Sequence, residues 1–447
     1  MKKSASLTEG SISQGLIVFA IPLILTSILQ QLYNTADLLI VGRFAGKEAM
    51  AAVGATGPIT QLLIGLFLGI ATGVGVVVAQ SFGSRNYQKL SSAVETSMAI
   101  AIGGGLVVTV FSYLLTPSLL ALMKTPGDIF DQAVVYMRLF FIGTVPLMVY
   151  NMGSGILRSM GDSKRPFYYL IVGALVNILL DLVFIAYLGW GVAGAGLATI
   201  LGQVASAFLT FYNLNRGNEF VLLKVKNIRI RQDVLKEILA IGVPSGLQAV
   251  VINLSNVIIQ AVINGFGSNA VAGNAAASRI DGFVFLTISS LGMAVMTFAG
   301  QNIGAGQMGR LKKGTRVGIK VTTLIIGGLS LLLVVFCSQL IGLFNNNPEV
   351  IEYGRLAILY LAPGYIIFGI MEILGGVLRA AGHATVPMVM SIVFMCIFRI
   401  FWMYLLLPHY YSIKTVFLSY PVTWILNFLG ILGYYLFVPW QPDGQQV

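Results

Sequence analysis

Long unbroken runs of apolar residues are the feature that most restricts how this chain can fold. They include residues 62–79 and 324–336. The strands of a membrane β-barrel alternate apolar and polar residues, which these runs do not do. Only 10% of the 447 residues are charged, whereas a soluble domain carries roughly 25%, so most of the surface must face lipid. The pattern predicts an all-α integral membrane protein.

The apolar stretches are numerous enough for twelve transmembrane helices, since about 20 residues suffice for one span. In the first half we expect spans near residues 12–41, 53–82, 90–122, 132–157, 167–188 and 195–214. In the second half we expect spans near residues 235–264, 270–303, 317–344, 351–378, 388–407 and 416–438.

The second half repeats the first. The pattern Leu157-Arg158-x-x-Gly161-x-x-x-x-Pro166 returns 221 residues later as Leu378-Arg379-x-x-Gly382-x-x-x-x-Pro387, and Gln80-x-x-Gly83 returns as Gln301-x-x-Gly304. Six spans per repeat is an even number, so both halves must enter the membrane from the same side. We predict two six-helix bundles related by a pseudo-two-fold axis along the membrane normal. Their expected bounds are 1–214 and 234–447, with a cytoplasmic linker at 215–233.

The net charge of +11 follows the membrane topology and does not indicate a nucleic-acid partner. With the N-terminus inside the cell, 19 of the 27 Lys and Arg residues lie in the expected cytoplasmic segments and 4 lie in the opposite loops. Positively charged loops remain on the cytoplasmic side of a membrane. We therefore predict a multi-pass protein of the cell membrane with both termini in the cytoplasm.

The sequence offers little for catalysis. Its two cysteines, Cys337 and Cys396, lie in separate apolar runs, and its two histidines, His383 and His409, are expected in or beside loops on opposite sides of the membrane. A membrane enzyme would need a nucleophile with a base, or a cluster of metal ligands. We expect neither an enzyme nor a bound cofactor.

Two carboxylates stand where a membrane span should have none. Asp37 and Asp181 are expected at a similar depth, near the outer part of spans one and five. Asn177 lies one turn before Asp181 on the same face, and Thr199 enters span six at that level. An intramembrane acid usually marks a functional site. The four oxygen-bearing side chains can share a proton, or they can coordinate a small cation such as Na⁺.

The alternative interpretation is that these four groups only form hydrogen bonds between helices, which amides or hydroxyls would do without an acid. The repeat bears on this alternative, because an offset of 221 places Ile258 opposite Asp37 and Trp402 opposite Asp181. The acids are absent from the second half. We predict that the coupling-ion site belongs to the first half alone, with no metal ion beyond a possible Na⁺.

Candidate substrate-binding residues form two groups. Gln30 and Tyr33 share one face of span one with Asp37, and a tyrosine ring attracts organic cations. Asn253, Asn256 and Gln260 follow an i, i+3, i+7 spacing on span seven, which places them on one face. They are expected either to line a cavity or to pack against neighbouring helices.

Charged residues inside the second-half spans complete the set of candidates. Glu372 lies in the inner half of span ten. Arg279 and Asp281 are two residues apart, so they cannot face each other on one helix, and each is expected to meet a partner elsewhere or a substrate. Arg399 is expected either to balance Glu372 or to contact a ligand.

Four segments together resemble the multidrug and toxic compound extrusion (MATE) family of secondary antiporters. They are Tyr33–Gly42, Leu157–Asp162, Asn177–Asp181 and Gly300–Gly306. The resemblance covers essentially the whole chain. It implies alternating access, with H⁺ or Na⁺ entering as organic cations leave, and it implies that Asp37, Asn177, Asp181 and Thr199 match the family's cation site. One branch of the family places an acid on helix seven, whereas this chain has amides there.

Two other transport functions remain open. A flippase for lipid-linked sugars would need several inward-facing arginines, but only Arg279 and Arg399 are expected well inside spans. A transporter dedicated to one metabolite would share the fold, and nothing in the sequence sets the breadth of substrates. The complete internal repeat favours a monomer.

Overall fold

The computed structural model describes residues 6–217 and 223–440, and these residues form helices with no β-strand. They divide into two compact units. One contains Leu25–Leu239, and the other contains Leu7–Ile24 together with the chain from Ala240 onward. The division falls within the first helix, α1 (Ile12–Ile40). Residues 218–222 of the expected linker lie outside the described residues, and the predicted lobe bounds stay a prediction.

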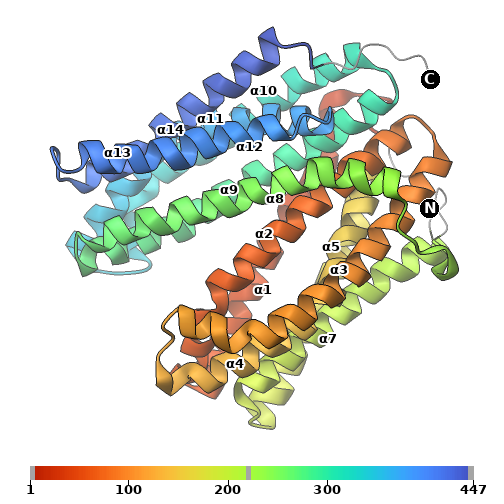
Figure 1. The fold of residues 1–447 in the computed structure, drawn as a ribbon. Helices are drawn as coiled ribbons and strands as arrows, with labels where there is room; N and C mark the ends of the chain where they lie inside the picture. Colours follow the sequence, from red (N-terminus) through yellow and green to blue (C-terminus); the bar gives the residue numbers. More distant parts are fainter. Residues whose placement is uncertain (1–5, 218–222, 441–447) are drawn as a thin grey trace. The chain divides into compact units, whose positions relative to one another are not determined.

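The helices follow the expected spans closely (Figure 1). After α1 and the π-helix η1 (Val41–Ala45) come α2 (Lys47–Gly83), α3 (Tyr87–Leu122), α4 (Gly127–Ile142), α5 (Thr144–Ser159), α6 (Lys164–Asp181), the π-helix η2 (Leu182–Tyr187), α7 (Gly191–Tyr212), the π-helix η3 (Asn213–Gly217) and the 3₁₀-helix η4 (Val225–Asn227). The second half contains α8 (Gln232–Asn264), α9 (Ser268–Gly304), α10 (Met308–Gly342), α11 (Pro348–Ala380), α12 (Thr385–Ser391), the π-helix η5 (Ile392–Phe398), α13 (Arg399–Leu406) and α14 (Ile413–Phe437).

Twelve of these segments are long and apolar enough to cross a membrane. Eleven are single helices, and the twelfth is the pair α4 and α5, which are bent by 45° relative to each other. The break is at Gly143, where an added Cβ would lie 2.8 Å from the Gln203 side chain. The predicted all-α membrane fold with twelve spans is therefore confirmed, with one span bent where we expected a single helix.

The internal repeat is visible in the backbone. Gly161 and Gly382 both have φ of 90°, Gly46 and Gly267 have φ of 93° and 95°, and each pair is 221 residues apart. Gly161 N–H donates to the Arg158 carbonyl, as Gly382 N–H donates to that of Arg379. A glycine in this left-handed conformation commonly ends a helix. The recurring Leu-Arg-x-x-Gly pattern therefore encodes the same helix end in both halves.

Two π-helices adjoin charged residues inside spans. Asp181 is the last residue of α6 and is followed directly by η2, and Arg399 is the first residue of α13 and follows η5. A π-helix closes its hydrogen bonds between residues i and i+5 and is frequent at functional sites. Both positions therefore combine an unusual backbone with an ionisable side chain.

The N-terminal segment before α1 is bound to the second unit. Leu7 is buried, and its N–H donates to Gln301 Oε1 at 2.9 Å. The Arg310 guanidinium donates to the carbonyl oxygens of Leu7, Glu9 and Gly10, at 2.8 to 3.3 Å. The Gln301 of the repeated motif thus has a structural role, and Arg310 fastens the start of α1.

Removing this fastening should loosen the N-terminal segment. We expect Arg310→Ala to increase the hydrogen-exchange rate of the Leu7 amide by roughly 10-fold, because hydrogen bonds to a charged group contribute about 1.5–3 kcal/mol. Exchange followed by mass spectrometry measures this rate. The control is Lys312→Ala, an exposed lysine on the same helix, which should leave it unchanged. Equal rates in both variants would show that Arg310 does not hold the segment.

Candidate functional site

The close approach of α6 and α7 builds the polar site of the first unit. Gly173 and Gly202 face each other, and a Cβ added to either would lie 2.7 Å from the other's carbonyl oxygen. Only glycine permits such an approach of two helix backbones. One turn beyond Gly173, Asn177 Nδ2 donates to Thr199 Oγ1 at 3.4 Å. The two glycines therefore place the predicted Asn177 and Thr199 in contact.

The carboxyl groups of Asp37 and Asp181 come together beside this contact. They lie within hydrogen-bonding reach of each other. Asp37 is 8% exposed and Asp181 is fully buried. No donor in the described part of the chain reaches Asp37 Oδ1, either carboxyl oxygen of Asp181, or Asn177 Oδ1. The structure thus gathers all four predicted residues in one place.

Four buried oxygen atoms without a donor are a costly arrangement. A buried polar group normally finds a hydrogen-bond partner, and an uncompensated buried charge costs much more than a neutral group. Two adjacent carboxylates also repel each other. A proton shared between Asp37 and Asp181, or a small cation held by the four oxygen atoms, would relieve these costs. The geometry thus suits H⁺ and Na⁺ equally.

Two tyrosines complete the surroundings of the acids. The Tyr33 hydroxyl contacts the Thr199 side chain, and buried Tyr136 lies near Asp37 and Asp181. The predictions included Tyr33 but missed Tyr136. Tyr136 is a single tyrosine on α4 without a polar residue at helical spacing that would have drawn attention to it.

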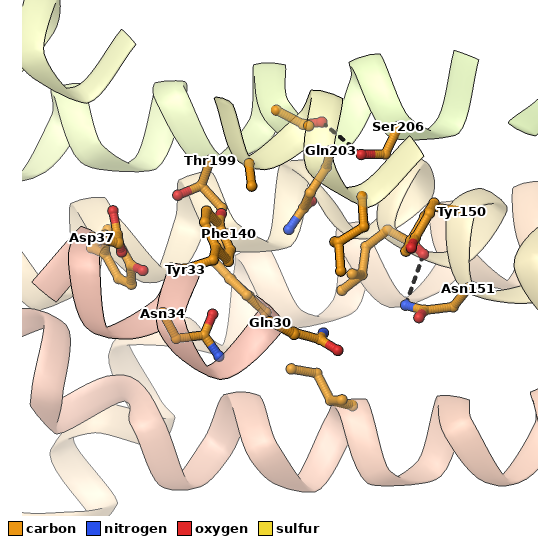
Figure 2. Close-up of a pocket in the computed structure, with 17 residues that line it drawn as sticks. Gln30, Tyr33, Asn34, Asp37, Phe140, Tyr150, Asn151, Thr199, Gln203 and Ser206 are labelled. Carbon is orange, nitrogen blue, oxygen red and sulfur yellow. Dashed lines mark hydrogen bonds between the residues drawn. The ribbon is translucent and has the colours of Figure 1, made fainter. Parts of the chain in front are cut away.

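A cavity of about 150 Å³ opens beside the acids. Figure 2 shows Asp37 near one end of its labelled residues and Asn151 near the other. The predicted residues Gln30, Tyr33, Asp37 and Thr199 line it. Other polar residues in its wall were not predicted, namely Asn34, Tyr136, Tyr150, Asn151, Gln203 and Ser206. No Lys or Arg lines this cavity, so its fixed charge comes from Asp37.

A larger cavity, of about 390 Å³, lies in the second unit. Asn256 and Gln260 line it, as expected for a cavity face of α8, and they are joined there by Asp281 and Arg399. Asn274 Nδ2 donates to Gln260 Oε1 at 3.1 Å, which links α9 to the row of amides on α8. Phe285, Phe368, Tyr420 and Trp424 form the aromatic part of the wall.

Three predicted residues do not line this cavity. Asn253 is only half-buried, and Arg279 is exposed. Glu372 forms an ion pair with Arg379, two turns along the same helix. The expectation that Arg399 might balance Glu372 is therefore wrong, because that carboxylate already has a cation within reach on α11.

Asp281 and Arg399 have separate partners. Tyr365 donates a hydrogen bond to Asp281, whereas Arg399 donates through Nε and Nη2 to Thr423 Oγ1, at 3.2 and 2.7 Å. The Arg399 guanidinium also lies 4.4 Å from the centre of the Tyr420 ring. The described residues contain no group of three or more His, Cys, Asp or Glu side chains that could hold a metal ion.

Comparisons with known proteins agree on one family. The MatE family model matches residues 22–183 and 244–405, one segment in each half. The chain is 30% identical over 444 residues to "Probable multidrug resistance protein YoeA" of Bacillus subtilis, covering 96% of this chain and 95% of that protein. It is 25% identical over 460 residues to the "FAD transporter" of Shewanella oneidensis, covering 98% and 96%.

A solved structure has the same fold. The crystal structure described as "MATE in the bent conformation" superposes with a TM-score of 0.90 at 24% identity, and the match covers 97% of this chain and 96% of that one. At this level of identity the comparison concerns the fold alone.

Proposed function

Because the chain belongs to the MATE family of multidrug efflux transporters, we propose that it is a cation-coupled antiporter which exports organic cations by alternating access. H⁺ or Na⁺ would enter as the substrate leaves. Asp37, Asn177, Asp181 and Thr199 would bind the coupling ion. The observation that carries the proposal is the contact between two buried carboxyl groups that lack donors.

Coupling follows if the ion and the substrate favour opposite conformations of the protein. A ligand shifts a conformational equilibrium only by its difference in affinity for the two states. A cationic substrate is attracted by a charged Asp37 in the cavity wall. Binding of H⁺ or Na⁺ removes that charge, and the substrate is released. The same two carboxyl groups would thus link the two binding events.

The cavity beside the acids offers contacts for an organic cation. Tyr33 and Gln30 line it together with Asp37, and an aromatic ring face attracts cations by about 0.5–2 kcal/mol. In the second unit, Asn256 and Gln260 line the larger cavity. We include these four residues in the substrate path. Asn253, Arg279 and Glu372 remain weaker candidates, since they do not line that cavity.

The topology belongs to the same proposal. The excess of Lys and Arg in alternate loops favours both termini in the cytoplasm and insertion in the cell membrane. The transporter would act as a monomer without a cofactor, because each chain contains both halves of the repeat.

A transporter dedicated to a single metabolite is the second candidate. It is favoured by the likeness to a protein named as an FAD transporter, which extends over nearly the whole chain. The flippase function has less support, because the cavity beside the acids has no arginine in its wall.

Transport driven by imposed gradients tests the antiporter. Purified protein is reconstituted in liposomes, and uptake of a fluorescent organic cation is followed under an outward-directed H⁺ or Na⁺ gradient across the membrane. We expect one of the two gradients to drive uptake above the level of protein-free liposomes, and Asp37→Asn to abolish the difference. Uptake that ignores both gradients would contradict the proposal and favour the single-metabolite transporter.

A further inference from the structure

Arg399 is a buried cation without a carboxylate partner. Its side chain is 1% exposed, and its hydrogen bonds in the described part of the chain all go to Thr423 Oγ1. The Tyr420 ring face stabilises the guanidinium, but neither a hydroxyl nor a ring neutralises its charge. A buried charge that lacks a counter-ion is strongly unfavourable. An arginine in a membrane span is rarely kept without a functional reason.

The nearby acid does not supply the missing counter-ion. Asp281 lines the same cavity, but it accepts a hydrogen bond from Tyr365 and forms no ion pair with Arg399 among the described residues. Both charges act on Tyr420, which lies between their fields. The two groups therefore remain separate, and Arg399 is available to an anion that enters the cavity.

The rest of the cavity suits a flat organic ligand. Its volume of about 390 Å³ lies within the usual range of about 300–1,000 Å³ for small-molecule pockets. Trp424 is surrounded by aromatic rings, with ring centres 6.0 Å from Phe285 and 5.3 Å from Phe368. Such a cluster binds planar apolar groups by stacking. Asn256 and Gln260 offer hydrogen bonds elsewhere in the wall.

The two halves have opposite charge at corresponding places. Tyr420, which stacks on Arg399, stands 221 residues after Thr199, which contacts Asn177 beside Asp181. The helix pair that carries the acids in the first half thus carries an arginine in the second. The cavity of the first unit has no basic residue in its wall, whereas that of the second unit has Arg399.

We propose that the cavity of the second unit binds an aromatic molecule bearing a carboxylate, with the carboxylate on Arg399 and the ring against Phe285 and Trp424. Arg pairs well with carboxylates because its planar fork of donors matches their two oxygen atoms. This ligand class differs from the organic cations of the proposed function. The inference does not rest on cation coupling, because binding needs no ion gradient.

Equilibrium dialysis of the detergent-solubilised full-length protein tests the proposal with three probes of one shape, namely naphthoate, the neutral naphthamide and the cationic naphthylmethylammonium. We expect naphthoate to bind at least about tenfold more tightly than naphthamide, the ratio typical of a hydrogen bond to a charged group. Equal affinities, or tighter binding of the cation, would overturn the proposal.

Two variants assign the preference to Arg399. Arg399→Gln should weaken naphthoate binding at least about tenfold and leave naphthamide binding within about twofold, whereas Arg399→Lys should keep part of the preference. The matched control is Arg279→Gln, an exposed arginine outside the cavity, and it should behave as the wild type. A preference for naphthoate that survives in folded Arg399→Gln protein would overturn the assignment. If that variant does not fold, the ranking of the three probes on the wild type still decides.

Discussion

Replacing Asp181 with asparagine should reduce gradient-driven uptake of an organic cation by roughly 10- to 100-fold, the range expected for loss of one coupling free energy. Asparagine keeps the size of the side chain but can neither be charged nor share a proton with Asp37. The site would then no longer respond to the coupling ion. Initial uptake rates in proteoliposomes under the driving gradient measure the loss.

The matched control for this prediction is Asp131→Asn, since Asp131 is an exposed acid on α4. It should transport like the wild type. The double variant of Asp37 and Asp181 should be no worse than either single one, because groups that act as a unit are not additive. Losses that multiply in the double variant, or normal uptake by Asp181→Asn, would show that the two carboxyl groups do not form one coupling site.

Replacing Gly202 with valine should remove both transport and much of the folded protein. A Cβ at this position would lie 2.7 Å from the Gly173 carbonyl oxygen and 2.8 Å from Asn177 Cβ. Backbone atoms cannot give way as a flexible side chain does, so α6 and α7 would separate, and overpacking typically costs about 1–3 kcal/mol. The contact between Asn177 and Thr199 would be lost with it. Size-exclusion chromatography and a thermal unfolding curve measure the folded fraction.

Gly103→Val provides the comparison. Gly103 lies in α3 with no atom within 4 Å of an added Cβ, so the same change should leave the elution profile and the unfolding temperature nearly unaltered. A Gly202→Val protein as stable as Gly103→Val would mean that the tight contact between α6 and α7 is not required.

The transmembrane architecture could be predicted from the sequence because lipid imposes a simple rule on it. A span must be apolar and about 20 residues long, and the twelve predicted spans agree with those observed. The bend between α4 and α5 could not be predicted in this way. It depends on the crowding of Gly143 by Gln203, a residue from another helix whose proximity is a tertiary property.

The candidate site was predictable where a residue type is itself unusual. An acid inside a span is costly wherever it lies, so Asp37 and Asp181 could be chosen without a structure, and their shared depth followed from helix geometry. Tyr136, in contrast, is unremarkable in an apolar helix. Its nearness to both acids depends on how α4 packs.

Ion pairs in the second half were harder to predict for the same reason. Glu372 and Arg379 are seven residues apart, a spacing that brings side chains to one face of a helix, so this pair was open to prediction. The binding of Arg399 to Thr423 depends instead on the packing of α14 beside the chain that includes η5 and α13. Sequence spacing carries no information about a partner on another helix.

The two π-helices alter the phase between the duplicated halves. A π turn contains roughly one residue more than an α turn. In the second half η5 precedes Arg399, whereas in the first half η2 follows Asp181. On reaching Arg399 the second copy has therefore advanced by roughly one residue, and the arginine takes the azimuth of Asn177 instead of that of Ile178. A single inserted residue, accommodated as a wide turn, would thus be enough to give one copy of an ancestral helix pair a new facing residue while its neighbours keep their register.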